Sequence, residues 1–128
     1  MSTKEFADAE REFTQLETKV LDWGMARGIL AHSTAQAQFL KTVEEMGELA
    51  SGLAKINKHL TRDAIGDVLV TLTFVAYHSN LDLTECMRYA YNEIKDRKGY
   101  LTAEGIFIKN EELEDFLGNH DAEDAPSI

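Results

Sequence analysis

The position of proline is the feature that most constrains how this chain can fold. Its 128 residues include a single proline, Pro126, so no residue in 1–125 interrupts a helix by lacking a backbone N–H. Residues that favour turns are also sparse over this length. Long α-helices are therefore expected, and we predict an all-α fold with a core of four helices.

A first helix is predicted over about residues 3–25, because apolar side chains recur there at intervals typical of one helix face. These side chains are Phe6, Phe13, Leu16, Val20 and Trp23. Residues 28–32 are expected to connect this helix to a second one over about residues 34–58, which Ser33 or Thr34 can cap. A third helix is predicted over about residues 61–79.

A fourth helix is predicted to begin at Asp82, which forms the pattern of a capping box with Glu85 three residues later. Gly99 is suited to end this helix, because glycine readily adopts the left-handed conformation found at such positions. A turn and a short extended segment are expected to follow. We predict that residues 1–109 form one helical domain.

Residues 68–75 allow a second interpretation. They are rich in β-branched side chains and could form a buried strand. We favour a helix, because the chain contains no partner strand of similar character. A helix that is apolar on nearly all sides is normally covered on all sides. In a chain this short, we expect a second subunit to supply part of that cover, and we predict a homodimer or a homotetramer.

Residues 110–128 are predicted to form an acidic tail that is partly disordered, with one weak helical patch over residues 111–117. The tail contains seven carboxylates and no Lys or Arg, so it accounts for seven of the ten net negative charges. A chain of this charge is not expected to bind a nucleic acid polymer, because such proteins normally present a basic surface.

Cysteine content and hydrophobicity point to the cytoplasm. Cys86 is the only cysteine, so no intrachain disulfide can form, which fits a reducing compartment. The N-terminus lacks the apolar run of a signal peptide. No stretch approaches the roughly 18 apolar residues of a membrane-spanning helix, so no association with a membrane is expected.

Two groups of carboxylates stand out. Glu44, Glu45 and Glu48 fall within one predicted helix, and Asp63 and Asp67 fall within the next. Residues three or four apart share a helix face, and each group is flanked by apolar positions. Carboxylates beside a core are costly unless something neutralises them. Mg²⁺ prefers oxygen ligands of this kind, so the pattern predicts a metal site between two helices.

The segments Glu44-Glu45-Met46-Gly47-Glu48 and Asp63-Ala64-Ile65-Gly66-Asp67 resemble the motifs of the MazG-like all-α nucleoside triphosphate pyrophosphohydrolases. The resemblance covers roughly residues 20–109. It implies a four-helix MazG-like bundle that uses Mg²⁺, or Mn²⁺, to hydrolyse a nucleoside triphosphate to a monophosphate and pyrophosphate. Deoxynucleotides are the expected substrates, and the expected role is control of the nucleotide pool.

The same resemblance implies roles for individual residues. Glu45, Glu48 and Asp67 would be metal ligands. Glu44 would be a further ligand, or would orient or deprotonate the attacking water. The family has Glu three residues before the aspartate of its second motif, whereas this chain has Ala64. Either Asp63 replaces the missing ligand, or the site has one protein ligand fewer.

Basic and amide side chains are expected to bind the triphosphate. The candidates are Lys41, Asn92, Lys95, Arg97, Lys98 and Lys109. A simpler explanation remains open for most of them, because cations near residue 97 favour a helix C-terminus and Lys41 can pair with a glutamate one turn away.

Two other functions remain open. The departure at Ala64 favours a catalytically silent helical dimer that binds a nucleotide or a protein partner. The third interpretation is a structural bundle in which residues 44–48 are merely surface. It predicts no thermal stabilisation by Mg²⁺, whereas a ligand that binds the native state must raise the melting temperature.

Overall fold

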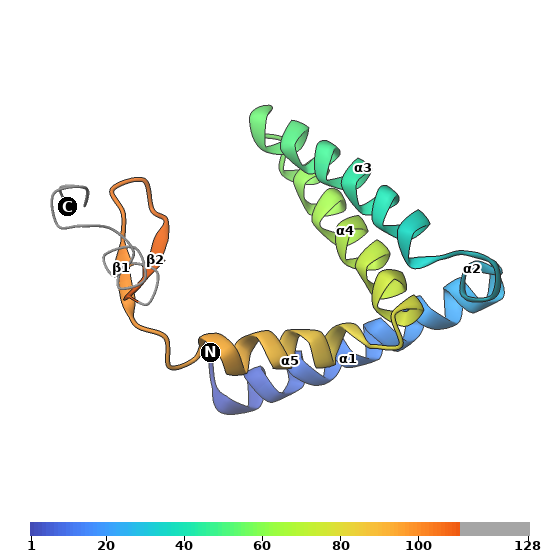
Figure 1. Ribbon diagram of the computed structural model, residues 1–128, viewed down its shortest axis with the longest axis horizontal. Helices are drawn as coiled ribbons and strands as arrows, with labels where there is room; N and C mark the ends of the chain where they lie inside the picture. The colour runs from blue at the N-terminus through green and yellow to red at the C-terminus, as the bar shows by residue number, and fades with distance from the viewer. Residues whose placement is uncertain (111–128) are drawn as a thin grey trace, which may run out of the picture. The chain divides into compact units, whose positions relative to one another are not determined.

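The computed structural model describes residues 1–110, and this part of the chain is mostly helical (Figure 1). It contains five α-helices and one β-hairpin: α1 (Thr3–Ala26), α2 (Ile29–His32), α3 (Ala35–Ala54), α4 (Lys58–His78), α5 (Leu83–Ile94), β1 (Gly99–Leu101) and β2 (Phe107–Lys109). The all-α prediction is confirmed for this part. The helical patch predicted over residues 111–117 lies outside the described residues.

Contacts within the chain define two units, which are described separately. The first unit comprises Met1–Arg88 and holds α1 to α4 with the beginning of α5. The second unit begins at Tyr89 and holds the rest of α5 and the hairpin. None of the helices within residues 1–110 has both the length and the hydrophobicity that are needed to cross a membrane.

The start of α1 is specified by a capping box. The Ser2 hydroxyl accepts a hydrogen bond from the Glu5 N–H, and the Glu5 carboxylate accepts one from the Ser2 N–H. After α1, Gly28 adopts a left-handed φ of 78°, which favours glycine. The prediction of a plain connection over residues 28–32 is wrong in one respect, because Ile29–His32 form the short helix α2.

The second and third predicted helices are confirmed, with different bounds. Thr34 caps α3 through the Ala37 N–H, as expected. The helix ends at Ala54, earlier than predicted, and Ile56 turns the chain with a positive φ of 52°. Asn57 then caps α4 through the Leu60 N–H, so α4 begins before residue 61. Residues 68–75 lie inside α4, which excludes the strand interpretation.

The fourth predicted helix is shorter than expected. Asp82 accepts a hydrogen bond from the Glu85 N–H at 2.7 Å, which confirms the predicted start of α5. The predicted end at Gly99 is wrong, because α5 ends at Ile94 and Gly99 begins β1. A side chain at Gly99 would collide with the carbonyl of Ile108 on β2. The expected extended segment is therefore an antiparallel hairpin.

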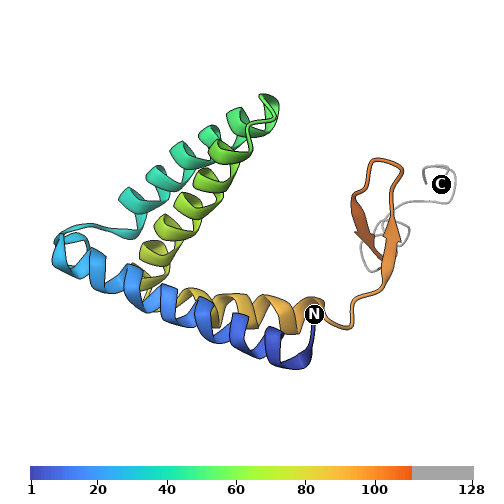
Figure 2. The ribbon, with the colours of Figure 1, turned by 180° about the vertical axis from the view of Figure 1, so that it is seen from behind.

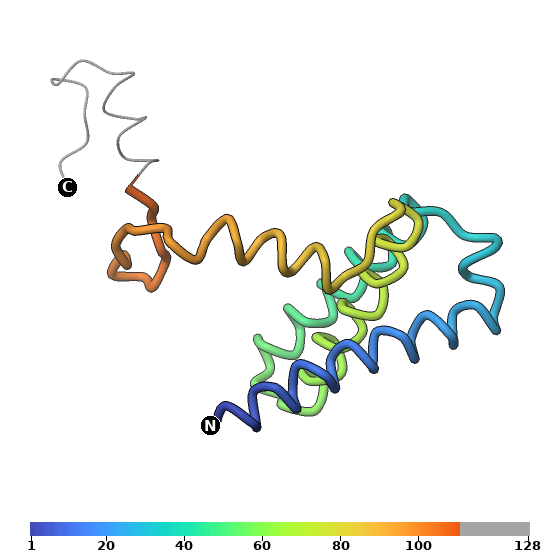
Figure 3. Tube along the Cα trace, turned by 90° about the horizontal axis from the view of Figure 1, so that it is seen from below, coloured from blue at the N-terminus to red at the C-terminus, as the bar shows by residue number. Residues whose placement is uncertain are grey.

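The closest association in the first unit is between α3 and α4. These helices run antiparallel and stay side by side along their length, as the front, back and bottom views agree (Figures 1, 2 and 3). Helix α1 meets α4 differently, through one aromatic contact. The rings of Trp23 and Phe74 lie 6.3 Å apart, and Gly24 leaves the space that the Phe74 ring fills. Phe74 is the largest fully buried side chain of the described residues.

The outer face of α3 is apolar and exposed within the single chain. Its residues alternate at spacings of four and three, and we call them the outer stripe: Phe39, Val43, Met46, Ala50 and Leu53. The four large side chains among them are each at least half exposed. A stripe with this spacing is the pattern by which one helix packs against another. The described residues therefore leave a helix face of α3 without cover.

Candidate functional site

A seam between α3 and α4 holds the candidate site. On α3, the residues that face α4 recur at helical spacing and are buried or half-buried, and these are Gln38, Thr42, Glu45, Leu49 and Gly52. Two contacts fix how the antiparallel helices align. The Thr42 hydroxyl lies 2.8 Å from that of Thr71. Gly52 lies so close to Thr61 that an added Cβ would be 3.0 Å from the Thr61 nitrogen.

Glu45 and Asp67 lie between these two contacts, one on each helix, and both are half-buried. Burial is the main cause that raises the pKa of Glu45 above its ordinary value of 4.5. The charges of Asp67, Glu48 and Glu44 raise that pKa further, whereas Lys41 lowers it. The carboxylates of the two helices are therefore close enough to repel one another.

Glu44 and Glu48 lie on the exposed side of the same helix. The Glu44 carboxylate accepts a hydrogen bond from the Lys41 ammonium at 2.9 Å, and this hydrogen bond is the main cause that raises the pKa of Lys41. The intrahelical pair expected for Lys41 is present. The three glutamates thus do not share one environment, because only Glu45 turns toward α4.

Ala64 and Asp63 are placed very differently on α4. Ala64 is 1% exposed and belongs to the buried side of the helix. Asp63 is exposed, and it is not among the charges that raise the pKa of Glu45. Asp67, one turn later, is the aspartate of this helix that does so. Asp67, rather than Asp63, is therefore the α4 carboxylate that lies near Glu45.

The carboxylates are neighbours without forming a closed cage. Within residues 1–110, no three side chains of His, Cys, Asp or Glu are gathered tightly enough to hold a metal ion. Even so, the donor set fits Mg²⁺, since it consists of carboxylate oxygens and this ion keeps several of its waters. A cation beside Glu45 and Asp67 would also relieve the repulsion that raises the Glu45 pKa. Glu45, Glu48 and Asp67 are the residues that could hold it.

The other predicted binding residues belong to the second unit, apart from Lys41. Asn92 lies on α5, and Lys95, Arg97 and Lys98 lie between α5 and β1; all four are exposed. Lys109 ends β2 and is half-buried. Within this unit, the hairpin closes where the Asn110 N–H donates to the Lys98 carbonyl. The basic side chains therefore flank the base of one hairpin.

Comparison with known proteins leaves the family of this chain open. No protein-family model and no solved structure matches it. Over 71 residues, it is 37% identical to the "Uncharacterized 18.2 kDa protein in rep-hol intergenic region" of Haemophilus phage HP1 (strain HP1c1). The match covers 56% of this chain and 44% of the phage protein, so it spans less than half the length of that relative.

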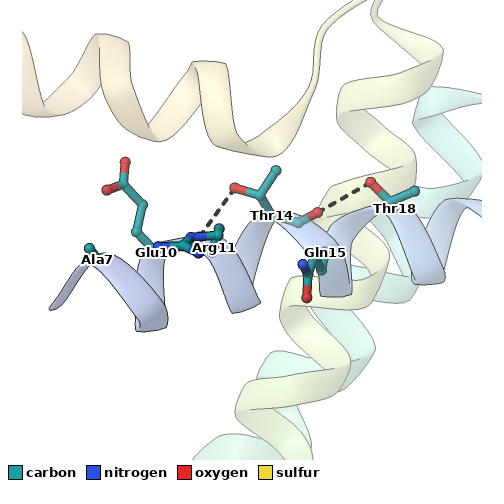
Figure 4. A pocket seen from close by; sticks show the side chains of 6 residues that line it. All are labelled: Ala7, Glu10, Arg11, Thr14, Gln15 and Thr18. Atoms are coloured by element: carbon teal, nitrogen blue, oxygen red, sulfur yellow. Dashed lines mark hydrogen bonds between the residues drawn. The ribbon is translucent and has the colours of Figure 1, made fainter. Parts of the chain in front are cut away.

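Among the hollows of the first unit, two lie along α1. One, of about 410 Å³, is lined by a single face of α1, from Ala7 to Thr18 (Figure 4). The hydroxyls of Thr14 and Thr18 turn back onto carbonyls of their own helix there. The other, of about 280 Å³, lies between α1 and α4, and its walls are mainly apolar. Neither hollow is lined by the carboxylates of the seam.

Sequence reasoning missed two polar contacts that shape this unit. Thr42 and Thr71 form the hydroxyl pair of the seam. Glu17, buried on α1, accepts hydrogen bonds from the backbone N–H and the hydroxyl of Thr84 at the start of α5. A threonine within an apolar run was the available signal for Thr71, because a buried polar group needs a partner. Thr42 and Glu17 have polar neighbours in the sequence and gave no such signal.

Proposed function

We propose that this chain is a Mg²⁺-dependent nucleoside triphosphate pyrophosphohydrolase of the MazG-like kind. It would act in the cytoplasm on the nucleotide pool, with deoxynucleoside triphosphates as substrates, and Mn²⁺ could replace Mg²⁺. One observation carries the proposal. Glu45 and Asp67 come from two different helices and lie half-buried. Burial raises the pKa of Glu45, and the charges of Asp67 and Glu48 raise it further. Carboxylates placed in this way are expected to need a cation.

The proposed roles of the acidic residues are those that the resemblance to the MazG-like motifs implies. Glu45, Glu48 and Asp67 would hold Mg²⁺, and Glu44 would accept a proton from the attacking water. When bound, Mg²⁺ would polarise the phosphoryl oxygens and offset the charge that otherwise repels a triphosphate. Asp63 is exposed and would contribute through its charge alone.

Binding of the triphosphate would fall to basic and amide side chains. Asn92, Lys95, Arg97, Lys98 and Lys109 are the candidates of the second unit. Lys41 is the candidate on α3, where it pairs with Glu44. A triphosphate would compete with Glu44 for the Lys41 ammonium, because phosphate oxygens accept charged hydrogen bonds as carboxylates do. That competition would leave Glu44 available as a base.

We also propose that the chain works as a homodimer or a homotetramer, with the outer stripe of α3 in the interface. The support is physical. Large exposed apolar patches on a soluble protein mark interaction sites, and the outer stripe has the spacing of a helix that packs on another helix. A second copy of the same helix would present the same apolar spacing.

The oligomer is tested by light scattering coupled to size-exclusion chromatography. Wild type is expected to elute as a dimer or tetramer. Val43→Glu is expected to elute with a lower molar mass, because the substitution would place a charge in the apolar interface and dissociate the oligomer. Thr18→Glu, on the exposed outer face of α1, is the matched control and should leave the mass unchanged. A wild-type chain that stays monomeric at high concentration would contradict this part of the proposal.

A second candidate function is favoured by Ala64. A methyl group occupies the buried position where the MazG-like motif has a glutamate. A catalytically silent helical dimer that binds a nucleotide or a protein partner would tolerate this change. It predicts binding of a triphosphate without release of pyrophosphate.

Pyrophosphate release distinguishes these functions. Ribo- and deoxynucleoside triphosphates are each incubated with the full chain and Mg²⁺ or Mn²⁺, with EDTA as the control. The proposed enzyme gives metal-dependent pyrophosphate and a monophosphate. Binding of a triphosphate without release would favour the silent dimer, and Ala64→Glu is then the first variant to assay. Absence of release, of binding and of thermal stabilisation by Mg²⁺ would reject both functions.

A further inference from the structure

A buried pair of hydroxyls joins α3 to α4. Thr42 is 3% exposed and Thr71 is 8% exposed, and their Oγ1 atoms lie 2.8 Å apart. Each hydroxyl also lies at hydrogen-bond distance from a carbonyl of its own helix, that of Gln38 for Thr42 and that of Val68 for Thr71. A hydroxyl carries one proton. One threonine therefore donates across the seam, while the other donates to its own helix.

The hydroxyl pair lies close to the carboxylates. Thr42 precedes Glu45 by three residues on α3, and Thr71 follows Asp67 by four on α4. Both intervals are one helical turn, so each threonine shares a helix face with the carboxylate that it neighbours. The contact of Gly52 with Thr61 lies on the other side of the same carboxylates. The seam is therefore fixed at two points, with Glu45 and Asp67 between them.

We infer that the Thr42–Thr71 hydroxyl pair is a positioning element, which holds α3 and α4 in the alignment at which Glu45 and Asp67 face the same cation. This inference rests on the proposed function. Helices slide past one another in steps of about 1.5 Å per residue, and each step turns a side chain by about 100°. Apolar contacts are non-directional, whereas a hydrogen bond requires one distance and angle. The hydroxyl pair therefore selects one alignment of α3 along α4, which apolar packing alone does not do.

Neighbouring residues make a strict test possible. Thr73 lies on α4, is 4% exposed, and donates from its hydroxyl to the Leu69 carbonyl of its own helix at 2.8 Å. It lines the hollow toward α1 rather than the seam. Thr73→Val therefore removes the same atoms as Thr71→Val, together with the same kind of bond within the helix, but leaves the seam untouched. It is the matched control.

The experiment compares Thr42→Val, Thr71→Val, the double variant, Thr73→Val and Thr71→Ser. Three quantities are measured on the full chain: the urea midpoint of unfolding, the Mg²⁺ concentration that gives half of the maximal thermal stabilisation, and kcat for pyrophosphate release. We expect Thr42→Val and Thr71→Val to raise the Mg²⁺ midpoint and lower kcat by about tenfold each, as for groups that orient metal ligands. In the Mg²⁺ midpoint and kcat, the double variant should be no worse than either single one, because the hydrogen bond across the seam is lost in all three.

The controls decide the interpretation. Thr73→Val should stay within about twofold of wild type in the Mg²⁺ midpoint and kcat, whatever its urea midpoint, and Thr71→Ser should restore both values because it keeps the hydroxyl. Suppose that Thr71→Val and Thr73→Val lower the urea midpoint by the same amount and do not differ from each other in the Mg²⁺ midpoint or in kcat. The Thr42–Thr71 pair is then structural only and the inference is wrong, while the proposed function stands. If wild type shows neither a Mg²⁺ response nor pyrophosphate release, the proposed function and the positioning role both fail.

Discussion

Helix α4 packs against its two neighbours in opposite ways. Toward α3 it presents small and polar side chains, with Thr61 against Gly52 and Thr71 against Thr42. Toward α1 it presents one large ring, Phe74, and the two helices otherwise leave a hollow of about 280 Å³ between them. The first contact is close and directional, whereas the second is apolar and open.

The two contacts of α4 are expected to have different roles, one in stability and the other in positioning the carboxylates. Burial of a large ring contributes more to stability than burial of an alanine or threonine, because stabilisation follows the apolar area removed from water. A close seam with hydrogen bonds contributes less area but fixes relative positions more narrowly. We therefore expect changes on the α3 side to affect the chemistry of the carboxylates, and changes on the α1 side to affect stability.

The largest effect is expected at the carboxylates. Glu45→Gln and Asp67→Asn each remove one charge of the proposed cation site and should lower kcat/KM for triphosphate hydrolysis by at least about 100-fold. The reason is that loss of a group that merely orients a ligand already costs 10–100-fold. Both variants should keep the helical circular dichroism spectrum of wild type.

Two conservative changes of exposed carboxylates serve as controls. Asp22→Asn, on α1, should leave activity unchanged. Asp63→Asn should have a small effect, because Asp63 is exposed and does not raise the Glu45 pKa. Full activity of Glu45→Gln or Asp67→Asn would contradict the assignment of the cation site. If Asp63→Asn lost as much kcat/KM as these two variants, Asp63 would also have to be a ligand of the cation.

The next effect concerns the contact between α1 and α4. Phe74 is 2% exposed, so Phe74→Ala should lower the free energy of unfolding by about 3–5 kcal/mol, as in other large-to-small changes in a core. Phe74→Leu keeps most of the apolar volume and should lose less. Urea denaturation measures both, and pyrophosphate release under native conditions should be nearly unchanged for Phe74→Leu. A loss of activity without a loss of stability would contradict the division between the two contacts.

A smaller effect is expected from glycines of α3. A Cβ at Gly52 would lie 3.0 Å from the backbone nitrogen of Thr61, so Gly52→Ala must force the seam apart. Such overpacking typically costs about 1–3 kcal/mol. A Cβ at Gly47 meets nothing within 4 Å, so Gly47→Ala should stabilise the helix by up to about 1 kcal/mol. Urea denaturation should show that Gly52→Ala lowers the free energy of unfolding and Gly47→Ala raises it. Changes of the same sign in the two variants would contradict a close contact between α3 and α4 at Gly52.

Much of the fold could be predicted because its signals are local. The long helices fit the absence of proline from residues 1–125, and the Thr34 and Asp82 caps act on residues three positions away. Which glutamate turns inward depends instead on how α3 aligns with α4. The sequence places Glu44 and Glu45 on adjacent positions, and only the contacts between the two helices distinguish them. The end of α5 was missed for a similar reason, because Gly99 is needed for a close approach to another strand rather than for a helix end.

The smallest effect is a change in the pH dependence of stability. Because burial and the neighbouring carboxylates raise the pKa of Glu45 in the folded chain, folding favours the protonated form. The corresponding contribution to stability is complete below the ordinary pKa of 4.5 and is lost as the pH rises through the folded-state value. Glu45→Gln cannot ionise, so in EDTA its urea midpoint should exceed that of wild type at pH 7 and approach it at pH 4. Mg²⁺ should raise the midpoint of wild type at pH 7 but not that of the variant. If the urea midpoints of Glu45→Gln and wild type differed by the same amount at both pH values, the Glu45 charge would not be repelled by Asp67. The contact between α3 and α4 would then not constrain side-chain positions more narrowly than the contact between α1 and α4.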